Sequence, residues 1–290
     1  MTEGHSTSHR PEGGNARGDP GLYGPDSVTW RLHADPSTMA LGGLRALMLQ
    51  ALHPLAMAGV AQHSEYRTDP WGRLFRTTKY VATMIYDTTA EAERAAARVR
   101  AVHGRLSGIE PESGTAYRVD DPALLLWVHC AEVDSFLAAY LRCGGRLRPS
   151  QADAYIAEQV RGAVLVGVDP RSCPVSLDGL RAYFEAVRPE LRATAEARAA
   201  LRFLLWPPPP PQAKPAWRPA WTALSLTAFG LLPAWARACF GICGLVLASP
   251  GTGLAATLGA RSLRAIVPLL PDDVRVSPAR RAAMARIAGA

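Results

Sequence analysis

Apolar residues recur at α-helical spacing through nearly the whole chain from Pro36 onward. Proline, glycine and short polar residues mark the ends of these runs, as at Asp35-Pro36, Asp121-Pro122 and Gly144-Gly145. Only a short stretch at 115–119 favours an extended conformation. We therefore predict an all-α fold, with helices over 36–52, 72–86, 88–107, 121–142, 149–168, 176–187, 194–205, 252–266 and 277–287.

Size and composition favour one domain. The chain has 290 residues, of which 48% are apolar, and a domain of this length buries roughly three quarters of its unfolded surface. No linker divides the middle of the chain, so we expect a single multi-helix domain over residues 26–290. Residues 1–25 have no apolar segment, and we predict a disordered tail there, not a signal peptide.

Cysteine and charge content limit the compartment and the partners. The five cysteines form no CxxC pair, which suits a reducing compartment and predicts a cytoplasmic protein. The net charge of +7 is spread along the chain without any nucleic-acid-binding motif, so we expect no nucleic-acid partner. The basic run from Arg275 to Arg286 is typical of a solvated helix face, with contact to an anionic membrane surface as the alternative.

The segment that follows residue 206 has an unusual composition. Residues 207–211 are five prolines, which predict an extended connector between packed helices. Residues 217–248 are strongly apolar, but Gly230 and Pro233 break the run and Arg237 adds a charge. We expect two short buried helices there, and a hairpin that contacts the membrane is the alternative.

Three histidines lie in or at the ends of apolar helices: His53, His103 and His129. A lone histidine in such a place is usually a hydrogen-bonded core residue, but burying three imidazoles in one helical core is costly unless they are paired or act as ligands. We find no HExxH, no pair of ExxH motifs, no GxGxxG, no P-loop and no GxSxG. A haem, which needs one axial nitrogen and a large apolar slot, fits what remains, and any of the three histidines could hold it.

A second group of polar residues follows in the helix predicted over 72–86. Arg73, Arg76, Thr77 and Tyr80 fall at positions i, i+3, i+4 and i+7, and therefore on one face. Two guanidinium groups, a hydroxyl and a phenol suit carboxylates such as haem propionates, or dioxygen. The alternative is an exposed basic face that forms surface ion pairs.

The order of these motifs resembles one known family, the rubber oxygenases (latex-clearing proteins) and the oxygenases of the mycophenolic-acid pathway. The resemblance covers roughly residues 26–288. It is carried by His53-Pro54, by His63-Ser64-Glu65-Tyr66-Arg67-Thr68-Asp69-Pro70, by Arg73 to Tyr80, by Val102-His103-Gly104, by Asp121 to His129, by Ser135-Phe136, by Leu231-Leu232-Pro233 and by Leu270-Pro271.

The resemblance implies a globin-like core around a buried pocket for one haem b. His103 is similar to the helix histidine that binds iron in the rubber oxygenases, and Arg73, Arg76 and Thr77 match their distal arginine, lysine and threonine. Arginine at position 76 replaces the lysine, and a guanidinium is not a practical iron ligand. Glu65 is a candidate for the family's distal acid.

These observations predict a haem b-dependent oxygenase that acts on a small apolar or prenylated molecule inside the cell, in secondary metabolism. Its expected partners are that substrate and dioxygen. In this hypothesis His103 holds iron, Arg73 and Tyr80 help to bind the cofactor, and Arg76 and Thr77 are catalytic. The alternative hypothesis is a non-catalytic haem-binding or lipid-binding helical protein at the membrane surface.

Overall fold

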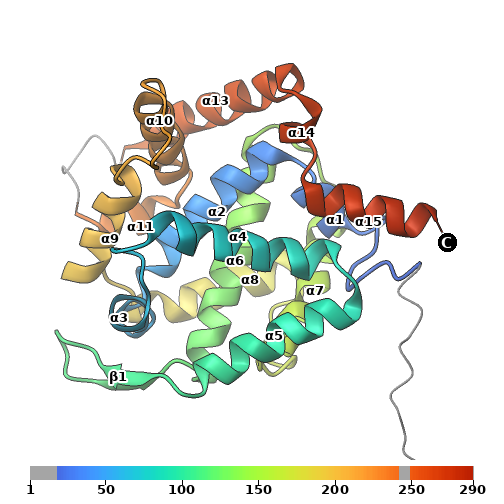
Figure 1. Cartoon of the computed structure of the whole chain (residues 1–290). Helices are drawn as coiled ribbons and strands as arrows, with labels where there is room; N and C mark the ends of the chain where they lie inside the picture. The colour runs from blue at the N-terminus through green and yellow to red at the C-terminus, as the bar shows by residue number, and fades with distance from the viewer. Residues whose placement is uncertain (1–17, 242–248, 290) are drawn as a thin grey trace, which may run out of the picture.

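The computed structural model describes residues 18–241 and 249–289. It confirms the all-α prediction, since helices account for most of the described chain and the strands form only one small hairpin (Figure 1). The predicted globin-like core stays a prediction. The α-helices are α1 Val28–His33, α2 Pro36–Gln50, α3 Pro54–His63, α4 Pro70–Tyr86, α5 Thr89–His103, α6 Pro122–Arg142, α7 Pro149–Leu165, α8 Leu177–Val187, α9 Ala195–Leu205, α10 Trp217–Gly230, α11 Ala234–Cys239, α13 Pro250–Ile266, α14 Asp272–Arg275 and α15 Pro278–Ala288.

Short polar side chains fix where several helices begin. Asp35 accepts a hydrogen bond from the backbone N–H of Ser37, and Asp121 accepts one from that of Ala123. Each aspartate is followed by a proline in the first helical turn, where a missing N–H costs nothing. Asp69, Thr88, Ser176 and Thr194 cap α4, α5, α8 and α9 in the same way. Local capping therefore accounts for most helix starts.

Helices α2 and α6 form the centre of the fold and pack more extensively on each other than any other pair (Figure 1). Gly42 allows the close approach, because a Cβ at this position would lie 2.5 Å from Cδ1 of Phe136. Beside this contact the buried guanidinium of Arg45 donates to Asp134 at 2.7 Å, to Ser135 at 2.7 Å and to the carbonyl of Leu231 at 3.0 Å. One buried cation therefore joins α2, α6 and the end of α10.

His53-Pro54 separates α2 from α3, so the first helix ends at Gln50, close to the predicted end at residue 52, and the two helices meet at an angle of 105°. The predicted end of the helix over 88–107 was wrong. The helix expected to run to residue 107 ends at His103, because Gly104 caps it and residues 107–109 form strand β1 (Ser107–Ile109). This strand pairs antiparallel with β2 (Ala116–Arg118), which lies within the stretch predicted to be extended.

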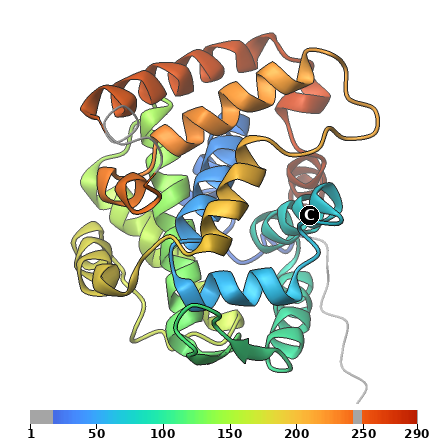
Figure 2. The same cartoon turned by 90° about the vertical axis from the view of Figure 1, so that its left-hand side faces the viewer.

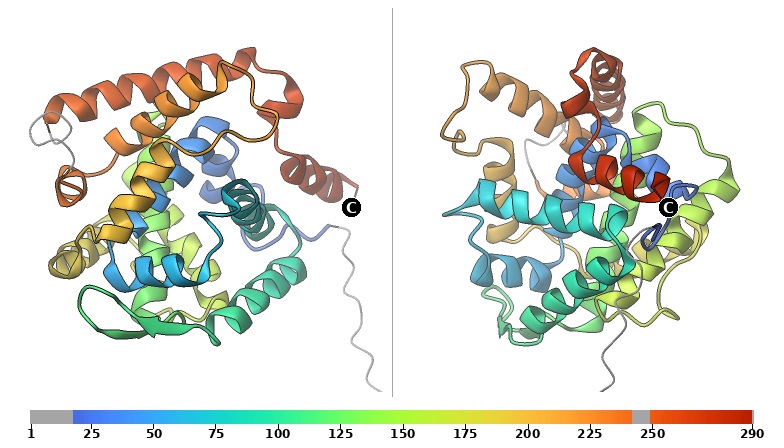
Figure 3. Two further views of the ribbon diagram at one scale, coloured as in Figure 1. Left: turned by 60° about the vertical axis from the view of Figure 1, so that its left-hand side comes forward. Right: turned by 45° about the vertical axis from the view of Figure 1, so that its right-hand side comes forward.

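The two ends of the described chain meet beside α4 and α5. Asp19 accepts hydrogen bonds from the backbone N–H and the hydroxyl of Thr89, and Arg286 of α15 donates to the carbonyl oxygens of Asp19 and Tyr86. The right-hand view of Figure 3 shows α15 on this side of the molecule. Residues 18–25, assigned to a disordered tail, are therefore packed on the domain, whereas residues 1–17 lie outside the described part.

The apolar segment 217–248 contains α10 and α11, which agree with the prediction of short helices; residues 242–248 lie outside the described residues. Among the described helices, α6 alone is long and apolar enough to cross a membrane. The bent pair α2–α3 would qualify as a second span only if its two helices were taken together. Of the apolar stretch of α6, 56% is buried inside the protein.

Candidate functional site

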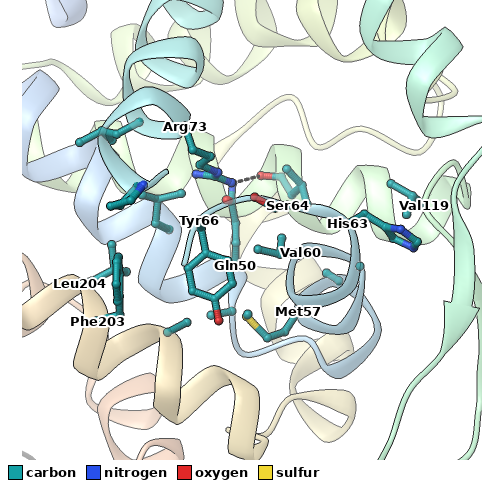
Figure 4. Close-up of a pocket in the computed structure, with 18 of the residues that line it drawn as sticks. Gln50, Met57, Val60, His63, Ser64, Tyr66, Arg73, Val119, Phe203 and Leu204 are labelled. Carbon is teal, nitrogen blue, oxygen red and sulfur yellow. Dashed lines mark hydrogen bonds between the residues drawn. The ribbon is translucent and has the colours of Figure 1, made fainter. Parts of the chain in front are cut away.

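A cavity of about 390 Å³ lies between α2, α3, α4, α6 and α9, and the end of α5 closes one side. Its volume is in the range of small-molecule sites, roughly 300–1,000 Å³. Figure 4 shows side chains from α3, α4 and α9 around it. Most of the lining is apolar, including Leu47, Met57, Val60, Leu125, Phe203 and Leu204.

Some polar groups of the cavity wall already have partners in the protein. The amide of Gln50 donates to the carbonyl of Val128 at 3.0 Å, the dashed line in Figure 4. The Nε2 atom of His63 lies 3.2 Å from the carbonyl of Ser107, and the hydroxyl of Tyr66 accepts from Arg67 at 3.0 Å. These groups can contact a ligand, but they do not require one.

His103 differs from the other polar residues of the wall. It is the last residue of α5 and lines the cavity, and its Nδ1 atom is buried without a hydrogen-bond partner among the described residues. Leaving such a group unpaired costs about 1–3 kcal/mol. Burial lowers the pKa of this imidazole, opposed by the carboxylate of Asp120, so the ring is neutral at pH 7. A neutral imidazole on an apolar wall can ligate a metal.

Arg73 supplies a cation to the same cavity from α4 (Figure 4). Burial and the neighbouring guanidinium of Arg76 lower its pKa, but an arginine remains protonated in proteins. Within the described parts of the chain Arg73 forms no ion pair and no side-chain hydrogen bond. Its charge is therefore available to an anionic group of a ligand.

The other residues of the predicted α4 face do not line this cavity. The guanidinium of Arg76 turns outward and donates to Asp69 at 3.0 Å and to Glu65 at 3.2 Å, all three being exposed. The hydroxyl of Thr77 donates to the carbonyl of Arg73 at 3.0 Å. Tyr80 is half-buried, and burial together with Glu132 raises the pKa of its phenol to about 12. The structure thus brings Arg73 and His103 to one cavity and places Arg76, Thr77 and Tyr80 elsewhere.

The two alternative histidines also lie away from the cavity wall. His53 caps α3, and its Nε2 atom lies 3.7 Å from the carboxylate of Glu190. His129 of α6 is half-buried, and burial lowers its pKa to about 4. In the described part of the chain no three His, Cys, Asp or Glu side chains are grouped to hold a metal ion. Of the three candidates, His103 alone lines the cavity.

An aromatic cluster at the cavity was missed by the sequence analysis. The indole of Trp71 lies edge-on to those of Trp221 and Trp217, with ring centres 5.0 and 5.5 Å away, and Trp71 and Trp221 line the cavity. Trp71 lies in the first turn of α4, whereas the other two lie in α10. No local spacing could indicate the cluster, because it forms only when α10 packs beside α4.

Residues 30–265 match the model of a protein family described as ER-bound oxygenase mpaB/B'/Rubber oxygenase, catalytic domain. The chain belongs to this family. The match confirms the resemblance drawn from the sequence motifs, and it makes the protein an enzyme of the oxygenase class that uses a substrate and dioxygen. No curated protein and no solved structure matches this chain significantly.

Proposed function

We propose that the protein is a haem b-dependent oxygenase that acts on a small apolar or prenylated molecule inside the cell. The observation that carries the proposal is His103, a neutral imidazole with an unpartnered buried nitrogen, on the wall of an apolar cavity. The residues present fit a haem, which needs one axial nitrogen, apolar walls for the ring and a cation for its propionates. The cytoplasmic location predicted from cysteine usage stays part of this proposal.

In this proposal His103 holds the iron and Arg73 binds the carboxylates of the cofactor by charge-assisted hydrogen bonds. The haem supplies the oxygen chemistry, while the protein binds and orients the substrate. The apolar side chains of α3, α6 and α9 exclude water and favour an apolar substrate by contact. A role of this domain in secondary metabolism is part of the same proposal.

The sequence also predicts catalytic roles for Arg76 and Thr77 and a cofactor-binding role for Tyr80, and these assignments stay predictions. Arg76 would have to leave Glu65 and Asp69 to reach the cavity. Exposed ion pairs of this kind contribute only about 0–1 kcal/mol, so their separation is not a large barrier. Once inside, Arg76 and Thr77 could donate hydrogen bonds to a polar group of the substrate.

Haem binding by histidine variants tests the proposal. We expect the full chain to develop a Soret band when titrated with haemin, and His103→Ala to lose that band. His53→Ala and His129→Ala should retain it, because neither residue lines the cavity. Circular dichroism of each variant controls for folding.

Two results would contradict the proposal at different levels. A wild-type protein without a Soret band on haemin titration would exclude the cofactor, and the apolar cavity would then belong to another oxygen chemistry. A folded His129→Ala variant that alone loses the band would leave the cofactor in place and show that His103 is not the ligand.

A further inference from the structure

The segment between Glu196 and Asp272 has a charge pattern unlike that of the rest of the chain. Residues 197–271 contain no aspartate and no glutamate, but they contain Lys214 and six arginines. These seven positive charges equal the net charge of the whole protein, +7. The remainder of the chain is therefore balanced. The excess positive charge forms no dense run, but all of it arises in this segment.

This segment folds into an outer layer made of α10 and α13. The two helices run side by side in Figures 2 and 3, at the edge of the molecule, and both pack their inner sides on α2. Small residues let them approach, because a Cβ on Gly230 would lie 2.6 Å from Cβ of Ala256, and one on Gly259 would lie 3.0 Å from Oγ1 of Thr227. Contacts of 230 with 256 and of 227 with 259 make the pair antiparallel.

The outer side of this layer is apolar. On α10 the exposed residues of the outer side after its first turn are Ala220, Ala223 and Leu226. On α13 and the short 3₁₀ turn that follows it, Leu254 is 64%, Leu258 56% and Leu269 81% exposed. We call these residues, together with Ala255, Arg261, Ser262, Ala265 and Ile266, the α10–α13 face. Contiguous exposed apolar patches are uncommon on monomeric proteins unless they bind something.

The charge of the α10–α13 face distinguishes between two possible binding partners, a second copy of the chain and an anionic lipid surface. Arg261 on the face and Lys214 beside α10 are exposed and form no ion pair within the described residues. In a symmetric dimer the same patch meets itself, so these cations would meet a surface without any carboxylate. An anionic lipid surface offers apolar chains to the leucines and negative headgroups to the flanking cations.

We propose that the α10–α13 face docks the protein on a bilayer that contains anionic lipid. Docking does not depend on a haem. It has a consequence that rests on the proposed function: Trp71, Trp217 and Trp221 cluster at the beginning of α10, and Trp71 and Trp221 line the cavity. Tryptophan favours the boundary between lipid and water. An apolar substrate dissolved in the bilayer could then enter the cavity along this aromatic wall.

The test measures binding of the full chain to vesicles by flotation. Vesicles of phosphatidylcholine with phosphatidylserine are compared with vesicles of phosphatidylcholine alone. We expect binding to the anionic vesicles only, weakened by salt, and about tenfold weaker for Leu258→Glu because a carboxylate replaces an inserted leucine. Arg261→Ala should bind about fivefold more weakly, because this is the affinity that one cation near an anionic surface contributes.

Val175→Glu is the matched control, since Val175 is exposed to the same extent as Leu258, 56%, and lies outside α10 and α13. It should bind as the wild type does. Equal binding to both kinds of vesicle, or equal losses in Leu258→Glu and Val175→Glu, would overturn the proposal. A wild-type dimer in solution that Leu258→Glu dissociates would assign the face to a second copy instead. Each readout is independent of haem and turnover, so failure here leaves the proposed function untouched.

Discussion

Charged side chains inside this domain differ in how well their surroundings satisfy them. Arg45 is buried, whereas Glu132 is half-buried. Arg45 donates to a carboxylate, a hydroxyl and a carbonyl, so its charge is compensated at the junction of α2, α6 and α10. Glu132 lies on α6 near Tyr23 and Tyr80 and makes no hydrogen bond or ion pair with the residues that the structure describes. Withdrawal from water without a partner raises the pKa of this carboxyl from 4.5 to about 7.

Glu132 should therefore make the stability of the protein depend on pH. The folded state holds its proton more tightly than the unfolded state, so the free energy of unfolding falls as pH rises from 4.5 to about 7. The full cost of this single group is of the order of 3 kcal/mol. We expect Glu132→Gln to stabilise the protein by up to that amount at pH 8 and to have little effect at pH 4.5, measured by urea unfolding at both pH values.

The exposed Glu185 provides the control for that experiment, because Glu185→Gln removes the same charge from a solvated position. Its free energy of unfolding should match that of the wild type at both pH values. A Glu132→Gln variant that is less stable than the wild type at pH 8 would show that the ionised carboxylate has a partner and is favoured in the fold.

At the level of elements, local chemistry accounts for where most helices lie. Asp35 and Asp121 precede prolines, and the helices predicted from these two pairs begin there. The end of α5 could not be predicted in this way, because the 104–119 segment pairs with itself as a hairpin after Gly104. Helix α1 was also missed, since its six residues are held by Glu158 of α7, which accepts from the backbone N–H groups of Val28 and Thr29.

The α2–α6 contact predicts that alanine substitutions at two adjacent glycines have opposite effects on stability. Gly42→Ala places a methyl group 2.5 Å from the ring of Phe136 and 3.1 Å from its backbone Cα. Overpacking of this kind costs about 1–3 kcal/mol. Gly43→Ala meets no atom within 4 Å and should stabilise α2 by up to about 1 kcal/mol through helix propensity alone. Thermal unfolding of both variants checks the pair, and a Gly42→Ala variant as stable as Gly43→Ala would mean that the two helices separate freely.

At the level of the whole molecule, the candidate site was predicted only in part. Arg73 and His103 were chosen from sequence and share a cavity, whereas Phe203 and Leu204 of α9 and Trp221 of α10 were not expected there. Arg73 and His103 belong to motifs that are close in the chain. The residues of α9 and α10 reach the cavity because segments more than a hundred positions away fold back onto α4. Their sequence could not indicate this, because an apolar helix carries no sign of which face meets a ligand.

The C-terminal helix α15 lies beyond the stretch that matches the family, which ends at residue 265. It nevertheless covers α4, the helix that carries Arg73. Its Ala283 is fully buried in a cluster with Trp30, Ile85 and Tyr86, whereas its neighbour Ala282 is exposed. Whole-domain stability should therefore depend on the docking of α15.

Two aspartate substitutions at adjacent positions test this dependence. Ala283→Asp puts a carboxylate without a partner among aromatic rings and should lower the free energy of unfolding by at least about 3 kcal/mol, or detach α15 to avoid that cost. Ala282→Asp adds the same charge in water and should change stability by less than about 0.5 kcal/mol. Urea unfolding separates the two, and amide hydrogen exchange should show lost protection in α4 and α15 for Ala283→Asp alone. Unchanged protection in both helices, with unchanged stability, would mean that α15 contributes nothing to the position of α4 and hence of Arg73.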